Sequence, residues 1–236
     1  MTCGVVLLFA WALSITPIRA ATIHDLTPTN GPNSSDSVKL SDLIAGDTIV
    51  VGDKEMSGFV YSPIGDMPPA DQVNVLGFKD PNNNLGLSFH GTFLDLPGGS
   101  FSDAMIRFDV AVDPVKGAGL KITDAHLFLS GVGVGTDSAL MVDETFMGTN
   151  QSLHTFMSTI NGGSTQLTDS TNFVPGVTKL TVTKDVLAMA GANSTLPARV
   201  TVIDQSFSQS HDVPEPATFA LLLAGVFAFV GLRRNR

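Results

Sequence analysis

Apolar and polar residues alternate with a period of two along most of residues 48–207, and no other feature constrains the fold as strongly. In residues 104–112 the even positions are Ala, Ile, Phe, Val and Val, whereas the odd positions include Arg107 and Asp109. The same alternation recurs in 85–93 and 179–187. Because successive side chains of a strand point to opposite faces, each of these segments predicts a half-buried antiparallel strand.

Clusters of Gly, Pro, Asn and Asp separate the alternating segments, and helical periodicity is weak before residue 217. Many short strands at regular spacing predict an all-β fold, a two-sheet antiparallel sandwich that is jelly-roll-like. One helical turn is expected at 185–192, and a change of parity near Asp124 predicts a β-bulge there. The expected strands are 48–51, 56–61, 72–79, 84–93, 101–113, 119–130, 136–147, 164–168, 177–187 and 198–207.

The two ends of the chain differ in composition from its middle. Residues 1–20 contain a ten-residue apolar run followed by Ile18-Arg19-Ala20, which predicts a secretory signal peptide cleaved near Ala20. Residues 21–47 are rich in turn-forming residues and are expected to be irregular. The β-sandwich domain is then expected at 48–212. The single cysteine, Cys3, lies in the predicted signal peptide, so neither disulfides nor thiol catalysis are expected after cleavage.

The C-terminal segment 213–236 contains Pro214-Glu215-Pro216, an uncharged run from Ala217 to Leu232, and the basic residues Arg233, Arg234 and Arg236. An apolar run without a polar face predicts a transmembrane helix. Sixteen residues at 1.5 Å each span about 24 Å, less than the ~30 Å hydrocarbon layer. The terminal arginines predict that this end stays in the cytoplasm.

These three parts, in this order, resemble the PEP-CTERM sorting signal of Gram-negative bacteria. The resemblance implies that an exosortase-type membrane enzyme recognises Pro214, Glu215 and Pro216 after the secretion machinery has exported the chain. Arg233, Arg234 and Arg236 would be the basic cluster of the membrane anchor. Cells that carry this signal typically make exopolysaccharide, so a destination at the cell surface or in a biofilm matrix is implied. An ordinary single-pass membrane anchor is the alternative.

The charge of the exported part limits its partners. All 22 acidic residues lie between Asp25 and Glu215, whereas four of the 13 basic residues lie in the two targeting segments. The exported part therefore carries a formal charge of −13, which would repel nucleic acid. Neutral polymers and divalent cations remain compatible with this charge.

Motifs for catalysis are not recognisable in the sequence. The histidines are scattered singly at positions 24, 90, 126, 154 and 211, a spacing that does not predict a zinc site. Glycosidase chemistry needs two carboxylates that face one cleft. Glu55 and Glu144 lie on expected strands beside other charged residues, and we expect both to be solvated, as we expect for His90.

Two loops are rich in oxygen ligands, Asp80-Pro81-Asn82-Asn83-Asn84 and 66–71. Carboxylate and amide oxygens are the ligands of calcium, but neither loop has the EF-hand pattern, and such residues also form ordinary turns. We therefore expect no cofactor, with calcium as an alternative.

Three functional classes are compatible with this sequence. We expect a non-enzymatic structural or adhesive protein of the cell surface or the exopolysaccharide matrix. A carbohydrate-binding module is the first alternative, although Tyr61 is the only tyrosine and Trp11 lies in the signal peptide, so aromatic residues for sugar stacking are few. A secreted hydrolase is the second alternative, and no motif supports it.

Overall fold

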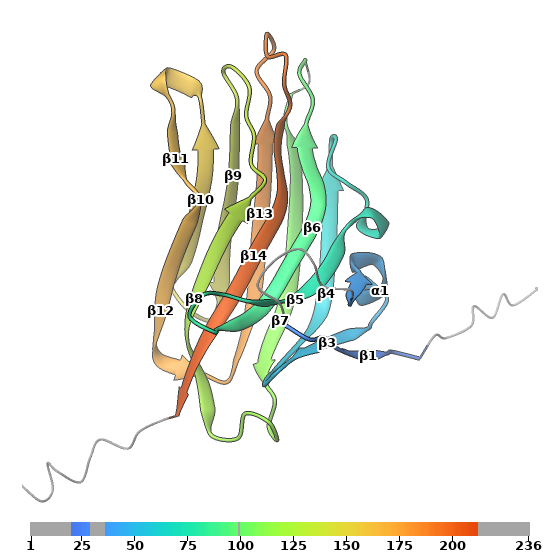
Figure 1. Ribbon diagram of the computed structural model, residues 1–236, viewed down its shortest axis with the longest axis vertical. Helices are drawn as coiled ribbons and strands as arrows, with labels where there is room; N and C mark the ends of the chain where they lie inside the picture. Colours follow the sequence, from blue (N-terminus) through green and yellow to red (C-terminus); the bar gives the residue numbers. More distant parts are fainter. Residues whose placement is uncertain (1–19, 29–35, 99, 212–236) are drawn as a thin grey trace, which may run out of the picture.

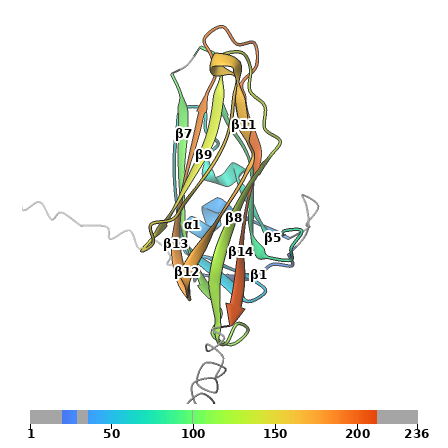
Figure 2. The ribbon, with the colours of Figure 1, turned by 90° about the vertical axis from the view of Figure 1, so that its left-hand side faces the viewer.

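Two β-sheets face each other in the computed structural model, which describes residues 20–28, 36–98 and 100–211 (Figure 1). Among these residues, eight strands form the first sheet in the order β1-β3-β4-β7-β13-β9-β10-β11, and six form the second in the order β12-β8-β14-β6-β5-β2. The view turned by 90° shows the two layers from the side (Figure 2). The predicted all-β two-sheet sandwich is therefore confirmed.

Neighbouring strands pair antiparallel throughout the described residues, except that β1 pairs parallel with β3. The first sheet consists of β1 (Ile23–Asp25), β3 (Thr48–Val51), β4 (Lys54–Ile64), β7 (Ser102–Val112), β13 (Lys179–Met189), β9 (Ala139–Met147), β10 (Ser152–Ser158) and β11 (Ser164–Gln166). The second sheet consists of β12 (Thr168–Val177), β8 (Leu120–Ser130), β14 (Ala198–His211), β6 (Leu85–Asp95), β5 (Asn74–Lys79) and β2 (Ser37–Lys39).

The core lies between the sheets and follows the alternation in the sequence. Along β7 the even positions from Ala104 to Val110 are wholly buried, and Arg107 is exposed. The Phe108 ring lies 5.5 Å from the ring of Phe59 on β4 and 5.8 Å from that of Phe89 on β6, centroid to centroid. Phe108 therefore connects the two sheets at the centre of the core.

The described parts of the segment 21–47, residues 21–28 and 36–47, are more ordered than expected. Besides β1 and β2, this segment contains the short helix α1 (Leu40–Ile44), whose Leu40 and Leu43 are buried. α1 contacts β4 of one sheet and β2 of the other, and it lies at the right-hand edge of the sandwich in Figure 1. The helix therefore closes an open edge of the core, a tertiary role that the turn-rich composition did not reveal. Two 3₁₀ turns, η1 (Ala70–Gln72) and η2 (Ile160–Gly162), complete the described elements.

The strand expectations were wrong in three further places. The expected helical turn at 185–192 is wrong, because 185–189 continue β13 in register with β7 and β9. β10 and most of β12 were missed because both are largely polar, and β12, an edge strand, contains Pro175.

The bulge near Asp124 is confirmed: the pairing of β14 with β8 shifts between Ser208 and Gln209, opposite Asp124 and Ile122.

None of the helices within 20–28, 36–98 and 100–211 is long and apolar enough to cross a membrane. The expected signal peptide, apart from Ala20, lies outside the described residues, as does the expected transmembrane helix 217–232.

Candidate ligand-binding site

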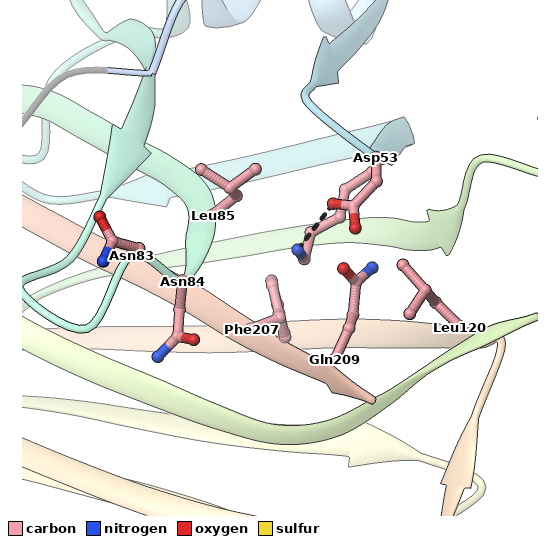
Figure 3. A pocket seen from close by; sticks show the side chains of 8 residues that line it. Asp53, Asn83, Asn84, Leu85, Leu120, Phe207 and Gln209 are labelled. Atoms are coloured by element: carbon pink, nitrogen blue, oxygen red, sulfur yellow. Dashed lines mark hydrogen bonds and ion pairs between the residues drawn. The ribbon is translucent and has the colours of Figure 1, made fainter. Parts of the chain in front are cut away.

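A pocket of about 210 Å³ opens at one end of the sandwich, where the β3–β4 turn, the β5–β6 loop, the start of β8 and the end of β14 meet (Figure 3). Its volume is below the roughly 300–1,000 Å³ of typical small-molecule sites, so it can hold one small group. The residues that line it are Asp53, Lys54, Asn83, Asn84, Leu85, Leu120, Phe207 and Gln209.

Lys54 brings a positive charge to this pocket from an inward-facing position at the start of β4. Its side chain is only 2% exposed, and Nζ donates to Oδ1 of Asp53 at 3.1 Å. Burial lowers the pKa of Lys54, and the neighbouring carboxylates, Asp53 first, oppose this shift. One N–H of the ammonium group donates to Asp53, and the others can donate to a ligand beside a carboxylate that can accept.

Gln209 supplies a donor without a partner. Its Nε2 atom is buried and has no hydrogen-bond partner among the described residues. In Figure 3 the Gln209 amide and the Asp53 carboxylate face each other across the pocket. A buried amide N–H without a partner costs free energy, which a ligand oxygen would recover.

The apolar lining consists of Leu85, Leu120 and the wholly buried Phe207. Together with the donors Lys54 and Gln209 and the acceptor Asp53, this surface suits a neutral ligand that has both apolar carbons and hydroxyl groups. Among the residues that line the pocket there is no serine, cysteine or histidine, so a nucleophile paired with an imidazole base is not present there.

The Asp80–Asn84 loop, one of the two oxygen-rich loops, is closed by its own hydrogen bonds. Oδ1 of Asp80 accepts from the backbone N–H groups of Asn82 at 2.8 Å and Asn84 at 2.9 Å. Oδ2 accepts from the Asn84 amide at 2.9 Å and from Ser206 Oγ at 2.8 Å. Burial favours a higher pKa for Asp80, but these hydrogen bonds, led by those from Asn84, outweigh it and hold the pKa below its usual value. The carboxylate thus orders the loop that carries Asn83 and Asn84 to the pocket.

The second oxygen-rich loop, 66–71, is also tied to its neighbours. Oδ2 of Asp66 accepts from the backbone N–H of Leu96 at 2.9 Å, and the Asp66 N–H donates to Ser102 Oγ at 2.8 Å. Within the described parts of the chain, no group of three or more His, Cys, Asp or Glu side chains could hold a metal ion.

His90 is half-buried and hydrogen-bonded, so the expectation of a solvated imidazole is wrong. Its Nε2 lies 2.7 Å from Ser88 Oγ, and the Ser88 hydroxyl donates to Asp204 on the neighbouring strand β14. Burial lowers the pKa of His90 and raises that of Asp204. Serine, not histidine, occupies the middle of this chain, so the carboxylate does not orient the imidazole as it does in a Ser-His-Asp triad.

Three of the other described histidines lie beside single carboxylates. His24 is 3.0 Å from Asp47, His126 is 3.0 Å from Asp124, and His154 contacts Asp143. These three pairs lie at different places in the two sheets, on β1, β8 and β10.

The two glutamates on strands behave differently. Glu55 is exposed, as expected. Glu144 was expected to be solvated, and this is wrong: its side chain is wholly buried and contacts Lys184, which is also wholly buried. The parity of β9 contained the signal, because Glu144 shares the inward face with Val142 and Phe146.

Aromatic side chains are mostly held internally. The Tyr61 hydroxyl donates to the backbone oxygen of Pro68 at 2.7 Å, and burial raises the Tyr61 pKa. Phe101 is 49% exposed, a large aromatic surface beside the start of β7. The sorting-signal residues Pro214, Glu215 and Pro216 and the basic residues Arg233, Arg234 and Arg236 lie outside the described residues.

Comparisons with known proteins identify the C-terminal segment. Residues 212–235 match the family model of the PEP-CTERM protein-sorting motif. No curated protein matches the chain.

Two solved structures are distantly similar to the sandwich. One is TmCBM61 in complex with beta-1,4-galactotriose, with 13% identity and a TM-score of 0.33 over 64% of this chain and 88% of that one. The other is TmCBM27, a carbohydrate-binding module studied for specific mannan recognition, with 9% identity and a TM-score of 0.30 over 75% of this chain and 96% of that one.

Proposed function

We propose, from the premise that the PEP-CTERM motif at 212–235 marks an exported protein processed by an exosortase, that this chain is a non-enzymatic structural or adhesive protein. It acts at the cell surface or within the exopolysaccharide matrix of a Gram-negative bacterium. The sorting motif is the observation that carries this proposal. The formal charge of −13 on the exported part supports it, because such a domain stays soluble among neutral polymers.

In this proposal the two ends of the chain act in sequence. The signal peptide 1–20 directs export by the secretion machinery, and the helix 217–232 then holds the chain in the cytoplasmic membrane. Exosortase recognises Pro214, Glu215 and Pro216, and the sandwich is released to the outside. Arg233, Arg234 and Arg236 set the orientation by remaining in the cytoplasm.

The arrangement of polar groups supports a non-enzymatic role. In the pocket, the buried Lys54 is paired with Asp53. Elsewhere His90 contacts Ser88, but Asp204 accepts a hydrogen bond from Ser88 and not from His90. Glu144, a candidate acid for glycoside hydrolysis, is wholly buried in the core and so does not face a cleft.

Cell fractionation tests the sorting part of this proposal. Replacing Pro214, Glu215 and Pro216 by alanine should leave the full-length protein in the inner membrane, whereas the wild-type chain leaves it. Wild-type processing of the triple variant would contradict the assignment. Replacing Pro68-Pro69, which lie outside the motif, is the matched control and should leave sorting unchanged.

A second candidate function, carbohydrate binding on a jelly-roll-like sandwich, is favoured by one observation. The pocket combines the unpartnered Gln209 amide, the Lys54–Asp53 pair and three apolar side chains. Sugars present alternating hydroxyl groups and C–H faces, which match these donors, acceptors and apolar atoms. The small volume suits one sugar unit and not a long chain segment.

A glycan array probed with the full chain recovered from outside the cell tests this second function. We expect binding to neutral glycans that is weakened in Gln209→Ala. Gln72, an exposed glutamine in η1 that does not line the pocket, gives the matched control Gln72→Ala, which should bind like the wild type. Equal binding by both variants would exclude the pocket as the sugar site.

A further inference from the structure

A buried polar cluster lies between the sheets, and none of its residues lines the pocket. It consists of Lys184 on β13, Glu144 on β9 and Gln205 on β14, and each of these side chains is 0% exposed. Lys184 and Glu144 are direct register partners in the first sheet, whereas Gln205 comes from the second sheet. Three polar side chains, from positions that usually hold apolar residues, therefore meet in the core between the two sheets.

The surroundings of this cluster exclude water. Lys184 is paired in register with Ile106 on its other side, and Gln205 is paired with Leu87 and Leu127. Ile106, Leu87 and Leu127 are all wholly buried. In such a dry environment, water does not compete with the lysine amine as a nucleophile at the amide carbon.

The contacts within the cluster bring reactive atoms together. Nζ of Lys184 contacts both Oε2 of Glu144 and Oε1 of Gln205, so the amide carbon of Gln205 is one bond from an atom that the amine touches. Nε2 of Gln205 has only a long hydrogen bond of 3.4 Å, to the backbone oxygen of Ser206. Oε1 of Glu144 is buried without a hydrogen-bond partner among the described residues. One carboxyl oxygen thus touches the amine, and the other is free to carry a proton.

Burial favours the uncharged forms of both ionisable groups. It lowers the pKa of Lys184, an effect that Glu144 opposes, and it raises the pKa of Glu144, an effect that Lys184 opposes. A neutral lysine amine has the lone pair that a nucleophile needs, and a neutral glutamic acid can donate a proton. Burying the charged forms of Lys184 and Glu144 in this dry core costs free energy. Conversion of the lysine amine to a neutral amide would remove that cost.

From this geometry we propose that Lys184 and Gln205 form an intramolecular isopeptide bond that joins the two sheets, with Glu144 as the proton carrier. The Nζ lone pair attacks Cδ of Gln205 while Glu144 donates its proton to the amide oxygen. Glu144 then takes a proton from Nζ and passes it to Nε2. As the Cδ–Nε2 bond breaks, the hydroxyl formed on the former amide oxygen returns its proton to Glu144 and the carbonyl re-forms. Ammonia leaves, the Nζ–Cδ amide remains, and Glu144 ends protonated as it began. The step is neither an oxidation nor a reduction, and it needs no cofactor.

This bond would give the exported domain a covalent link that its cysteine content does not allow. Cys3, in the segment before residue 20, is the only cysteine of the chain. The link would connect β13 to β14 and close the chain between residues 184 and 205. Because the cluster lies inside the core and does not line the pocket, the proposal is independent of any ligand.

Peptide mass spectrometry of the wild-type chain tests the proposal directly. The full chain is expressed with its own signals, recovered, denatured and digested with trypsin. We expect no cleavage after Lys184 and a branched peptide in which residues 180–199 are joined to the peptide that begins at Val200, lighter by one ammonia than the sum of the two. Separate, unmodified peptides ending at Lys184 and beginning at Val200 would overturn the proposal.

Two variants test the role of Glu144. Glu144→Gln removes the proton carrier with little change in volume, and Glu55→Gln makes the same change at an exposed position of the same sheet. We expect the branched peptide to be lost in Glu144→Gln and retained in Glu55→Gln. A branched peptide that persists in Glu144→Gln would overturn the role given to Glu144. If Glu144→Gln does not fold, the wild-type digest still decides whether the bond exists.

Discussion

Individual polar residues in this sandwich sit at positions where strand parity calls for apolar ones. Lys54, Glu144, Lys184 and Gln205 all face inward and are at most 2% exposed. Residue type alone predicted Glu144 to be solvated, whereas its parity with Val142 and Phe146 predicted the reverse. Where residue type and strand parity conflict, parity decides which face of the sheet a side chain occupies. Turning one inward residue outward would require a one-residue shift of register, which would move every side chain of the strand to the opposite face.

Asp80 provides a prediction at the level of a single side chain. Its carboxylate accepts from Asn82, Asn84 and Ser206, and its side chain is 1% exposed. Asp80→Ala leaves buried donors unpaired, so we expect a loss of unfolding free energy of at least about 1–3 kcal/mol. Urea denaturation measures this loss. Asp71→Ala, at an exposed position in η1, is the control and should change stability little. Equal stability of the two variants would contradict the role of Asp80 in the loop.

Asp185 predicts a pH dependence on the outer face of the first sheet. Hydrogen bonding to Asp103, burial, and the charges of Asp103 and Asp143 raise its pKa from 3.8 to about 6. The folded state therefore binds this proton more tightly than the unfolded state. The resulting stabilisation is complete below about pH 4 and is lost as the pH rises through about 6.

The variant Asp185→Asn removes this titration. Between pH 4 and 6, urea midpoints of the wild type should fall relative to those of Asp185→Asn as the pH rises. Asp71→Asn gives the control, whose midpoints should follow the wild type. A constant difference between wild type and Asp185→Asn across this range would show that Asp185 does not titrate there.

Among the elements, β7 could be read from the sequence and β12 could not. The inward residues of β7 are uniformly apolar, whereas β12 has Phe173 as its buried apolar residue and shifts register against β8 between Asn172 and Val177. β10 buries Thr155 beside Leu153, so its alternation is hidden by a polar residue in the core. α1 is stabilised because Leu40 and Leu43 pack against an open edge of the sandwich, and that edge exists only in the folded chain. The pocket was missed for the same reason, since its lining residues come from four segments that the fold brings together.

The central position of β7 leads to a prediction about packing. Phe108 stacks on Phe59 and contacts Phe89 of the other sheet, and all three are at most 4% exposed. Phe108→Ala should lower the unfolding free energy by about 3–5 kcal/mol, because the cavity cannot close from both sheets at once. Phe101→Ala removes the same ring from a site that is 49% exposed and should cost far less. Thermal unfolding of both variants measures the difference, and similar losses would contradict a core centred on Phe108.

At the scale of the whole molecule, the sequence indicated the destination of the chain more clearly than the task of its domain. The Pro-Glu-Pro triplet, apolar run and basic end are contiguous, so the motif at 212–235 could be recognised without a fold. The pocket and the buried cluster are assembled from segments that are distant in the sequence, and only the pairing of strands brings their residues together. Hence the sorting signal was identified from the sequence, whereas Gln209, Lys184 and Gln205 were not.

The length of the C-terminal apolar run leads to the last prediction. Sixteen residues span about 24 Å, a marginal crossing of a ~30 Å hydrocarbon layer. A permanent anchor would gain from several more apolar residues, whereas a transient one has only to present Pro214, Glu215 and Pro216 at the outer face of the membrane. We therefore expect that the mature protein lacks the apolar run and is found outside the cytoplasmic membrane.

Mass spectrometry of the C-terminal peptide recovered from outside the cell checks this expectation. The mature chain should end near the Pro-Glu-Pro triplet, and peptides from 217–236 should remain with the membrane fraction. A variant with five leucines inserted after Ala224 keeps the triplet and the arginines but makes a full-length span, and it separates the length of the helix from recognition of the motif. If the exported wild-type protein retains Arg236, the helix is the final anchor, and the sandwich then works while attached to the membrane.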